Sequence, residues 1–310
     1  MREARFLAEL ERLEVADWKP PGRFDPDAGV WVTETEAQVS FPESGVNVFS
    51  SVDLDSFWFD HRNEVIADLL SAEVPPELTF VEVGSGSGVV VDYLRRTSSR
   101  PIASVEPIPA GAIAVARRGV HLSFCGDLAS LDLPTNSIPA LGAFDVVEHL
   151  DQPELLLEEC RRVLKKDGRL ILTVPAYPWL WSEHDVWNGH VQRFTLSTLT
   201  RLLDESGFEV VKGTYLFLPL LLPAMVSRLV VEKLRRRRSD GQIESHMEGA
   251  LAPRSPIVHR ILRLIHAVER VWVRRVKVPF GTSILVAARP KPTQRDQDRS
   301  SSDNRQAPLP

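Results

Sequence analysis

Three alternating glycines lie between a short apolar segment and a helical pattern, an arrangement that can hold a nucleotide-like ligand. The apolar segment 80–83 contains Glu82, and the loop that follows contains Gly84, Ser85, Gly86, Ser87 and Gly88. Glycine lets the backbone turn tightly and lets a ligand approach the main chain closely. That ligand then faces the free N–H groups of a helix N-terminus. The loop predicts a nucleotide or cofactor site, although dehydrogenases and transferases both use such loops.

Two acids that follow the next two apolar segments narrow the kind of ligand. Glu106 lies 18 positions beyond Gly88, where a carboxylate can accept hydrogen bonds from both ribose hydroxyls of an adenosine. Asp127 and the adjoining Leu128 follow the third apolar segment, where Asp127 can meet the adenine amino group. Isolated acids at loop starts are usually turn formers or helix caps. Together with the glycine loop, they predict an adenosine-binding cradle.

Short apolar runs alternate with single helical patterns from residue 78 to residue 216. Such alternation is typical of parallel β-α-β units, and the nearly continuous apolar character of the strands indicates helices on both faces of the sheet. The predicted strands are residues 79–83, 102–106, 122–125, 140–144, 170–174, 209–216 and 282–287. The predicted helices are residues 56–72, 88–96, 110–118, 153–165 and 197–206. We therefore expect a doubly wound, mostly parallel α/β sheet.

Beyond the glycine loop, the chain resembles the class I S-adenosylmethionine-dependent methyltransferases, particularly the bacterial type 11 group. The resemblance covers roughly residues 57–206 and 282–287, and is most specific in 141–150 (LGAFDVVEHL), 160–170 (CRRVLKKDGRL) and the block that contains Gly189-His190. It implies a Rossmann-like sheet of seven strands with the last one antiparallel, and S-adenosyl-L-methionine as the cofactor. Ile138-Pro139 depart from the family's Phe-Asp at the start of the fourth strand, far from the ligand crevice.

With this resemblance, the expected cofactor-binding residues are Glu82, Gly84, Ser85, Gly86, Gly88, Glu106, Asp127, Leu128 and Asp145. Methyl transfer requires positioning of the acceptor and, for a hydroxyl or an amine, removal of a proton. His149 follows the fourth strand and is the first candidate for the general base, because imidazole titrates near neutrality. His190 is the second candidate. The alternative for both is a histidine that only hydrogen-bonds a loop.

Aromatic residues accompany these candidates on both sides of the crevice. Tyr177, Trp179, Trp181 and Trp187 are interpreted as the border of an acceptor pocket or as core packing. Helix 56–72 begins with three aromatic residues followed by Arg62, and we expect it to cover the cofactor site.

The predicted organisation is an N-terminal helical and irregular extension (1–55), a methyltransferase domain (56–288) and a disordered polar tail (289–310). The domain includes a helical, basic insertion at 217–278. Residues 228–277 carry 13 basic and 5 acidic side chains, whereas residues 1–227 carry 19 and 34. This split argues against a general nucleic-acid coat, and we expect no nucleic-acid partner. We expect either peripheral contact of 217–275 with an anionic membrane, aided by the Arg235–Arg238 run, or a helical cap that packs on the sheet and leaves the arginine run solvated.

From its cysteine usage and its hydropathy, we expect the protein to be cytoplasmic. Cys125 and Cys160 form no Cys-x-x-Cys pair, so a disulfide framework or a structural zinc site is not expected and no metal ligands are predicted. The N-terminus has no signal-peptide apolar core. The 15 uncharged residues 213–227 contain two prolines and are too short to span a membrane, which takes about 20 residues.

The sequence predicts an S-adenosylmethionine-dependent methyltransferase acting on a small-molecule or lipid-linked acceptor, at oxygen. The alternatives are an NAD- or nucleotide-sugar-binding oxidoreductase on a similar sheet, or a cofactor-binding scaffold without turnover.

Overall fold

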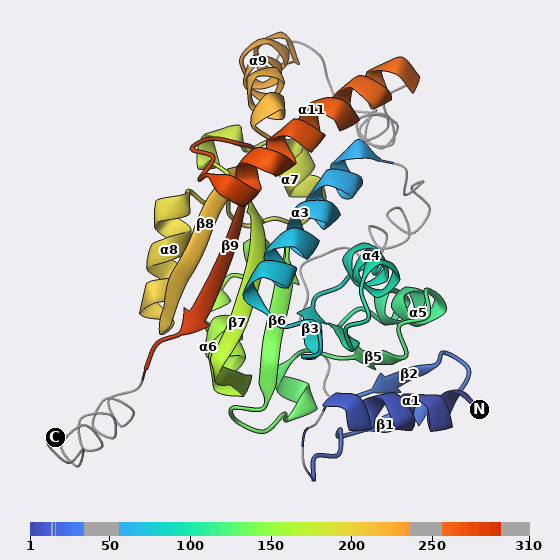
Figure 1. The fold of residues 1–310 in the computed structure, drawn as a ribbon. Helices are drawn as coiled ribbons and strands as arrows, with labels where there is room; N and C mark the ends of the chain where they lie inside the picture. The colour runs from blue at the N-terminus through green and yellow to red at the C-terminus, as the bar shows by residue number, and fades with distance from the viewer. Residues whose placement is uncertain (14, 16, 34–55, 236–255, 293–310) are drawn as a thin grey trace, which may run out of the picture.

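The computed structural model describes residues 1–33 except 14 and 16, residues 56–235 and residues 256–292. Nine strands in this part of the chain form one sheet: β1 (Arg23–Asp25), β2 (Val30–Val32), β3 (Phe80–Val83), β4 (Ile102–Glu106), β5 (Leu122–Cys125), β6 (Ile138–Phe144), β7 (Leu164–Pro175), β8 (Phe208–Leu216) and β9 (Ser283–Pro290). Their order in the sheet is β1-β2-β5-β4-β3-β6-β7-β9-β8. Figure 1 shows this twisted sheet with helices on both sides.

The doubly wound α/β fold that the sequence predicts is confirmed. Strands β5, β4, β3, β6 and β7 run parallel to one another. The last strand, β9, is antiparallel and lies between β7 and β8. Pro139 lies near the start of β6, where the pairing with β7 shifts in register between Ile138 and Ala140. The sheet therefore accommodates the proline where the loss of a ladder donor costs little.

The predicted count of seven strands is wrong, because two further strands extend one edge. The segment that was expected to be helical and irregular supplies β1 and β2 as well as α1 (Arg2–Leu10). β2 pairs parallel with β5, and β1 forms a hairpin with β2. Phe6 of α1 stacks on Trp31 and contacts the edge of Phe124, with ring centroids 5.4 Å apart in each pair. Strands of three residues are too short to show an alternating pattern, and tertiary packing decides them.

Two apolar cores lie on the two faces of the sheet, as the buried strands require. One face packs against α3 (Phe57–Glu73), α4 (Val89–Thr97) and α11 (Pro256–Arg275). The other packs against α1, α6 (Pro153–Val163) and α8 (Leu196–Glu205). Helix α5 (Pro109–Arg117) packs beside α4 through Val91 and Val115.

The described residues between β8 and β9, in the segment for which the sequence predicts a helical and basic insertion, form helices α9 (Leu218–Arg235) and α11. Helix α9 leaves the sheet, and α11 returns alongside α3 (Figure 1). Arg270 of α11 forms an ion pair with Asp68 of α3 at 2.6 Å. Residues 236–238 of the predicted arginine run lie outside the described residues. No helix of the described ranges is long and apolar enough to cross a membrane.

The last strand extends beyond the predicted end of the domain, and both cysteines are buried thiols. β9 continues to Pro290, two residues beyond the expected boundary at 288. Residues 293–310 of the predicted tail lie outside the described part of the chain. Cys125 and Cys160 are free and buried, as expected.

A buried arginine, Arg100, binds the segment that connects the end of α3 to the start of β3. Arg100 is 6% exposed, and its guanidinium donates to the carbonyl oxygens of Val74, Pro75 and Leu78 at 2.8 Å each. The carbonyl oxygen of Pro75 also accepts from the N–H of Leu78 at 3.2 Å. Arg100 therefore holds the chain at the point where it enters the central strand.

We predict that Arg100→Leu lowers the free energy of unfolding by about 3 kcal/mol, because one buried and two partly buried hydrogen bonds of the guanidinium are lost. Urea unfolding followed by circular dichroism measures this change. Arg117→Leu, at an exposed position of α5, is the matched control and should shift the midpoint very little. Equal destabilisation by both substitutions would contradict the structural role of Arg100.

Candidate functional site

The glycine loop connects β3 to α4 with three residues in the left-handed backbone region. Gly84, Gly86 and Gly88 have φ angles of +70°, +53° and +79°. A Cβ at Gly84 would lie 2.6 Å from the side chain of Val146, so this part of the loop packs against the segment after β6. A Cβ at Gly86 would meet nothing within 4 Å. The loop is therefore closely packed at its start and open at Gly86.

Glu106 at the end of β4 is joined directly to this loop. Its carboxylate accepts hydrogen bonds from the backbone N–H groups of Gly86 at 2.6 Å and Ile108 at 2.8 Å. The side chain is only 3% exposed, and this burial raises its pKa to about 7 despite the two hydrogen bonds. The structure thus brings the predicted second-strand acid to the glycine loop. Its contact with a ribose stays a prediction.

A second buried acid lies on β3 itself. Glu82 is 2% exposed, and its Oε2 has no hydrogen-bond partner among the described residues. Burial raises the pKa of Glu82 to about 8, and the charge of Arg62 opposes this shift. A buried carboxyl oxygen without a hydrogen-bond partner destabilises the fold unless a bound ligand supplies a donor. Glu82 is therefore a candidate contact for a cationic group.

Arg62 of α3 is turned inward, and its guanidinium forms an ion pair with Asp145 at 2.5 Å. Asp145 has a φ of +56° at the end of β6 and also accepts a hydrogen bond from the Thr173 hydroxyl at 3.1 Å. The guanidinium lies over the ring of Trp58, 5.2 Å from its centroid. The charge pair is thereby fixed beside the loop, whereas the sequence suggested only a covering role for Arg62.

The remaining predicted cofactor residues use their side chains within the fold. The hydroxyl groups of Ser85 and Ser104 lie 2.6 Å apart. Asp127 Oδ1 accepts from the N–H of Ser130 at 2.7 Å, which is the turn-forming role considered for such an acid. Leu128 is 1% exposed and belongs to the main core, so only its backbone can reach a ligand.

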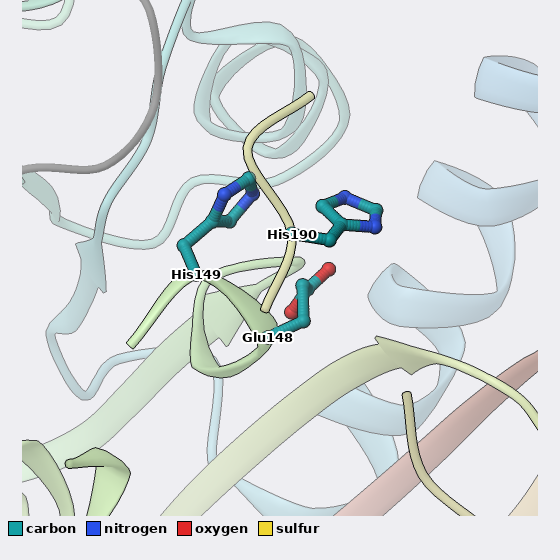
Figure 2. Close-up of side chains that lie close together, drawn as sticks. All are labelled: Glu148, His149 and His190. Carbon is teal, nitrogen blue, oxygen red and sulfur yellow. The ribbon is translucent and has the colours of Figure 1, made fainter. Parts of the chain in front are cut away.

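Figure 2 shows a second group of polar side chains, Glu148, His149 and His190, that lie together. Glu148 and His149 belong to the short helix η3 (Val147–His149) that follows β6. The rings of the two histidines are 4.8 Å apart, edge to face. His149 Nδ1 lies 3.3 Å from the carbonyl oxygen of Gly189. Burial, and then the neighbouring His190, lower the pKa of His149 to about 4, so its ring is neutral at pH 7.

Asp185 anchors the second histidine. It belongs to α7 (Glu183–Trp187), is fully buried, and its Oδ1 contacts His190 Nδ1 at 2.8 Å and Arg193 Nε at 2.6 Å. Its Oδ2 accepts from the N–H of Ser182 at 2.8 Å, within a capping box. Burial alone would raise the pKa of Asp185, but the hydrogen bonds from His190 and Arg193 hold it well below its ordinary value. His190 is therefore held in one orientation.

The structure brings the two predicted histidines together, although 41 positions separate them in the sequence. Sequence reasoning did not select Glu148, Asp185 and Arg193 as site residues. These three charged residues lie within the sequence blocks that resemble the family, and this position could have marked them as site residues. What the sequence could not show is that Asp185 lies inside the protein and points at His190.

These residues fit S-adenosylmethionine as the cofactor. An adenosine ribose requires acceptors near the loop, and Glu106 is held there by Gly86. The methionine ammonium requires hydrogen-bond acceptors, and the unpartnered oxygen of Glu82 offers one. The open space at Gly86 admits a ligand to the backbone of the loop.

Comparison with known proteins agrees with this geometry. The profile of a family described as "Methyltransferase domain" matches residues 58–212. A probable S-adenosylmethionine-dependent methyltransferase of Mycolicibacterium smegmatis is 27% identical over 174 residues, which are 55% of this chain and 66% of that protein. A chloroplastic 2-methyl-6-phytyl-1,4-hydroquinone methyltransferase of Arabidopsis thaliana is 27% identical over 120 residues, 36% of this chain and 35% of that protein. The matches therefore span less than two thirds of these relatives.

A solved structure from Thermotoga maritima has the same fold. It is described as an S-adenosylmethionine-dependent methyltransferase, possible histamine N-methyltransferase, and it aligns with a TM-score of 0.50 and 20% identity over 80% of this chain and 97% of that one. This likeness concerns the fold alone. The family profile covers half of the chain and includes the glycine loop, Glu106 and the histidine pair. The chain belongs to the methyltransferase domain family.

Proposed function

We propose that the protein is an S-adenosylmethionine-dependent methyltransferase that acts on the oxygen of a small-molecule or lipid-linked acceptor. The observation that carries the proposal is the buried pair Glu82 and Glu106 beside an open glycine loop. Buried carboxyl groups destabilise a fold unless they serve a ligand, so their placement at the carboxyl ends of parallel strands indicates cofactor binding.

Each residue of the cradle has a proposed task. Glu106 accepts hydrogen bonds from the ribose hydroxyls, and Asp127 contacts the adenine amino group. Glu82 and Asp145 balance the ammonium group of the methionine part, while Arg62 keeps Asp145 oriented. S-adenosylmethionine, when bound, supplies a methyl group on a cationic sulfur that an oxygen nucleophile can displace.

The pair His149 and His190 is proposed to border the binding site of the methyl acceptor. A neutral imidazole nitrogen accepts hydrogen bonds, so His149 can orient an acceptor hydroxyl with the ring of His190 beside it. Tyr177 lies near this region as the residue before η4 (Pro178–Leu180), and it stacks on Trp179 and on Tyr215 with ring centroids 5.2 Å apart in each pair. Trp179 is 53% exposed, which leaves it accessible to an apolar acceptor.

Helix α11 supports a lipid-linked acceptor, because it buries two polar side chains and exposes most of its large apolar ones. The face that packs inward contains His266 and Glu269, and both are buried. The opposite face exposes a stripe of large apolar side chains at helical spacing: Ile257, Ile261, Leu264, Ile265, Val268 and Trp272. Exposed apolar patches of this kind mark surfaces for membranes or partners.

The arginines of α11 favour an anionic membrane surface as the proposed partner of this apolar stripe. Arg260 and Arg275 are exposed on α11, and Arg263 and Arg274 have side chains that are 57% and 62% exposed. An amphipathic helix with arginines beside an apolar stripe lies in the headgroup region of anionic bilayers. The plant relative is named for an acceptor with a phytyl chain, which is consistent with a lipid-linked acceptor here.

We predict that the wild-type protein binds S-adenosylhomocysteine and does not bind NAD in titration calorimetry. Gly86→Leu should weaken binding of S-adenosylhomocysteine by about 100-fold, because the side chain fills the open space beside the loop. Gly29→Leu is the matched control, since Gly29 also has a positive φ (+76°) but lies in the β1-β2 hairpin. It should share the loss of stability without the loss of affinity.

Absence of S-adenosylhomocysteine binding by the wild type would refute the proposed function. Unchanged affinity of Gly86→Leu would refute the position of the cradle. Transfer of a labelled methyl group from S-adenosylmethionine to a cell extract distinguishes an enzyme from an inactive cofactor-binding scaffold.

Glu82→Gln should have opposite effects on stability and on cofactor binding. The folded protein holds the Glu82 proton with a pKa of about 8 instead of 4.5, so ionisation of this group destabilises the fold progressively as pH rises between these values. The substitution should therefore raise the melting temperature by about 5 °C at pH 8.5 and by much less at pH 5. It should also weaken S-adenosylhomocysteine binding.

Glu158→Gln, an exposed position on α6, is the control and should show no such pH dependence. The measurement is differential scanning fluorimetry from pH 5 to pH 8.5. A lower melting temperature of Glu82→Gln at pH 8.5 would show that the carboxylate is stabilised within the fold and has no need of a ligand.

The membrane proposal predicts that the protein sediments with vesicles of phosphatidylglycerol and phosphatidylcholine. The double substitution Leu264→Glu and Trp272→Glu should reduce the bound fraction by about 10-fold, because charges replace buried apolar surface at the headgroups. Leu155→Glu, an equally exposed leucine on α6 (61%), should bind like the wild type. Wild-type protein that stays in the supernatant would refute the membrane contact.

A further inference from the structure

Glu148, His149 and His190 have the chemistry and the separation of a metal-binding triad. Each offers one ligand atom, and these atoms all lie within 4.8 Å of one another. This is the one such group of three or more found in the described part of the chain. Figure 2 shows the carboxylate of Glu148 directed toward the ring of His190, with His149 on the adjoining turn.

Glu148 is buried without a hydrogen-bond partner for its carboxylate group in the described part of the chain. Its side chain has no exposed surface, and neither carboxylate oxygen has a hydrogen-bond partner among the described residues. The arginines nearby are already paired, Arg62 with Asp145 and Arg193 with Asp185. A carboxylate buried in this way requires a counter-charge within reach of its oxygens.

Both histidines present a lone pair on the same ring atom. The groups facing their Nδ1 atoms, the Gly189 carbonyl and the Asp185 carboxylate, can only accept a hydrogen bond. Each Nδ1 therefore carries the proton, and in the neutral ring Nε2 is the acceptor. Metal-binding histidines are oriented in this manner by a carboxylate or a backbone carbonyl behind them.

We propose that Glu148, His149 and His190 bind one divalent transition-metal cation and leave a further coordination position for an oxygen ligand. Two imidazoles with one carboxylate favour zinc, iron or manganese over magnesium, which prefers oxygen ligands. Ligands around a shared metal at about 2.1 Å lie about 3.0–3.5 Å apart, so the three side chains close by about 1 Å on binding.

The open position is suited to the oxygen of the methyl acceptor, an assignment that rests on the proposed function. A metal-bound hydroxyl loses its proton to water more readily than a free one. The oxygen keeps the electron pair that forms the new carbon–oxygen bond, while the carbon–sulfur bond breaks and leaves a neutral thioether. Glu148 and the histidines would thus act through the metal rather than as the general base.

Metal binding by the purified full-length chain tests the site independently of the cofactor. Equilibrium dialysis against Zn²⁺, followed by elemental analysis, should give one bound metal per chain. Co²⁺ should give the visible absorption of an ion with nitrogen and oxygen ligands in a site of four or five coordination. Glu148→Gln and His190→Gln should each weaken binding by about 100-fold or more, and Asp185→Asn by about 10-fold, through loss of ring orientation.

His121→Gln is the matched control, since His121 lies between α5 and β5 and should leave metal affinity unchanged. Calorimetry with S-adenosylhomocysteine shows that each variant is folded, and a second histidine variant replaces any that is not. Wild-type binding equal to that of Glu148→Gln or His190→Gln would overturn the proposal. If S-adenosylhomocysteine binds but metal does not, the metal site alone fails. If metal binds but S-adenosylhomocysteine does not, the proposed function fails.

Discussion

The pairing of β3 with β4 on one side and β6 on the other determines where the glycine loop, Glu106 and Asp145 lie. These three strands are parallel, so their carboxyl ends meet at one edge of the sheet. The glycine loop leaves from β3, Glu106 ends β4, and Asp145 follows β6. Gly84 packs against Val146, which requires a residue without a side chain at that position. A shift of register in either pairing would separate the loop from the acids.

The same edge concentrates groups that are unfavourable for folding. Glu82, Glu106 and Glu148 are buried carboxyl groups, and burial raises the pKa of each. Asp145 and Asp185 are instead compensated by Arg62 and Arg193. This division suggests two kinds of acid in the site. Asp185, paired with Arg193, belongs to the frame of the site, whereas Asp145 and the acids without an arginine partner are proposed to face ligands.

The insertion between β8 and β9 extends the domain without disturbing the sheet. Helix α11 is joined to the fold by polar contacts, such as Glu269 with the N–H of Leu218 at 2.6 Å and with His61 at 2.8 Å. Val273 of this helix is buried in the apolar core, but most of its large apolar residues lie at the surface, unlike those of an ordinary helix of a globular protein. The composition shows that this segment is basic. Only the structure shows that its arginines lie beside an exposed apolar face of α11.

Local patterns in the sequence determined the order of the main elements, the glycine loop and the acids at the strand ends, whereas β7 begins at Leu164, within the predicted helix 153–165. They succeed because turn chemistry and apolar runs act over a few neighbouring residues. Only the tertiary structure decided the nine-stranded sheet, the inward turn of Arg62, the outward apolar face of α11 and the meeting of Glu148 with His190. Those features depend on contacts between segments tens of residues apart, and long-range packing leaves no periodic signal in a single sequence.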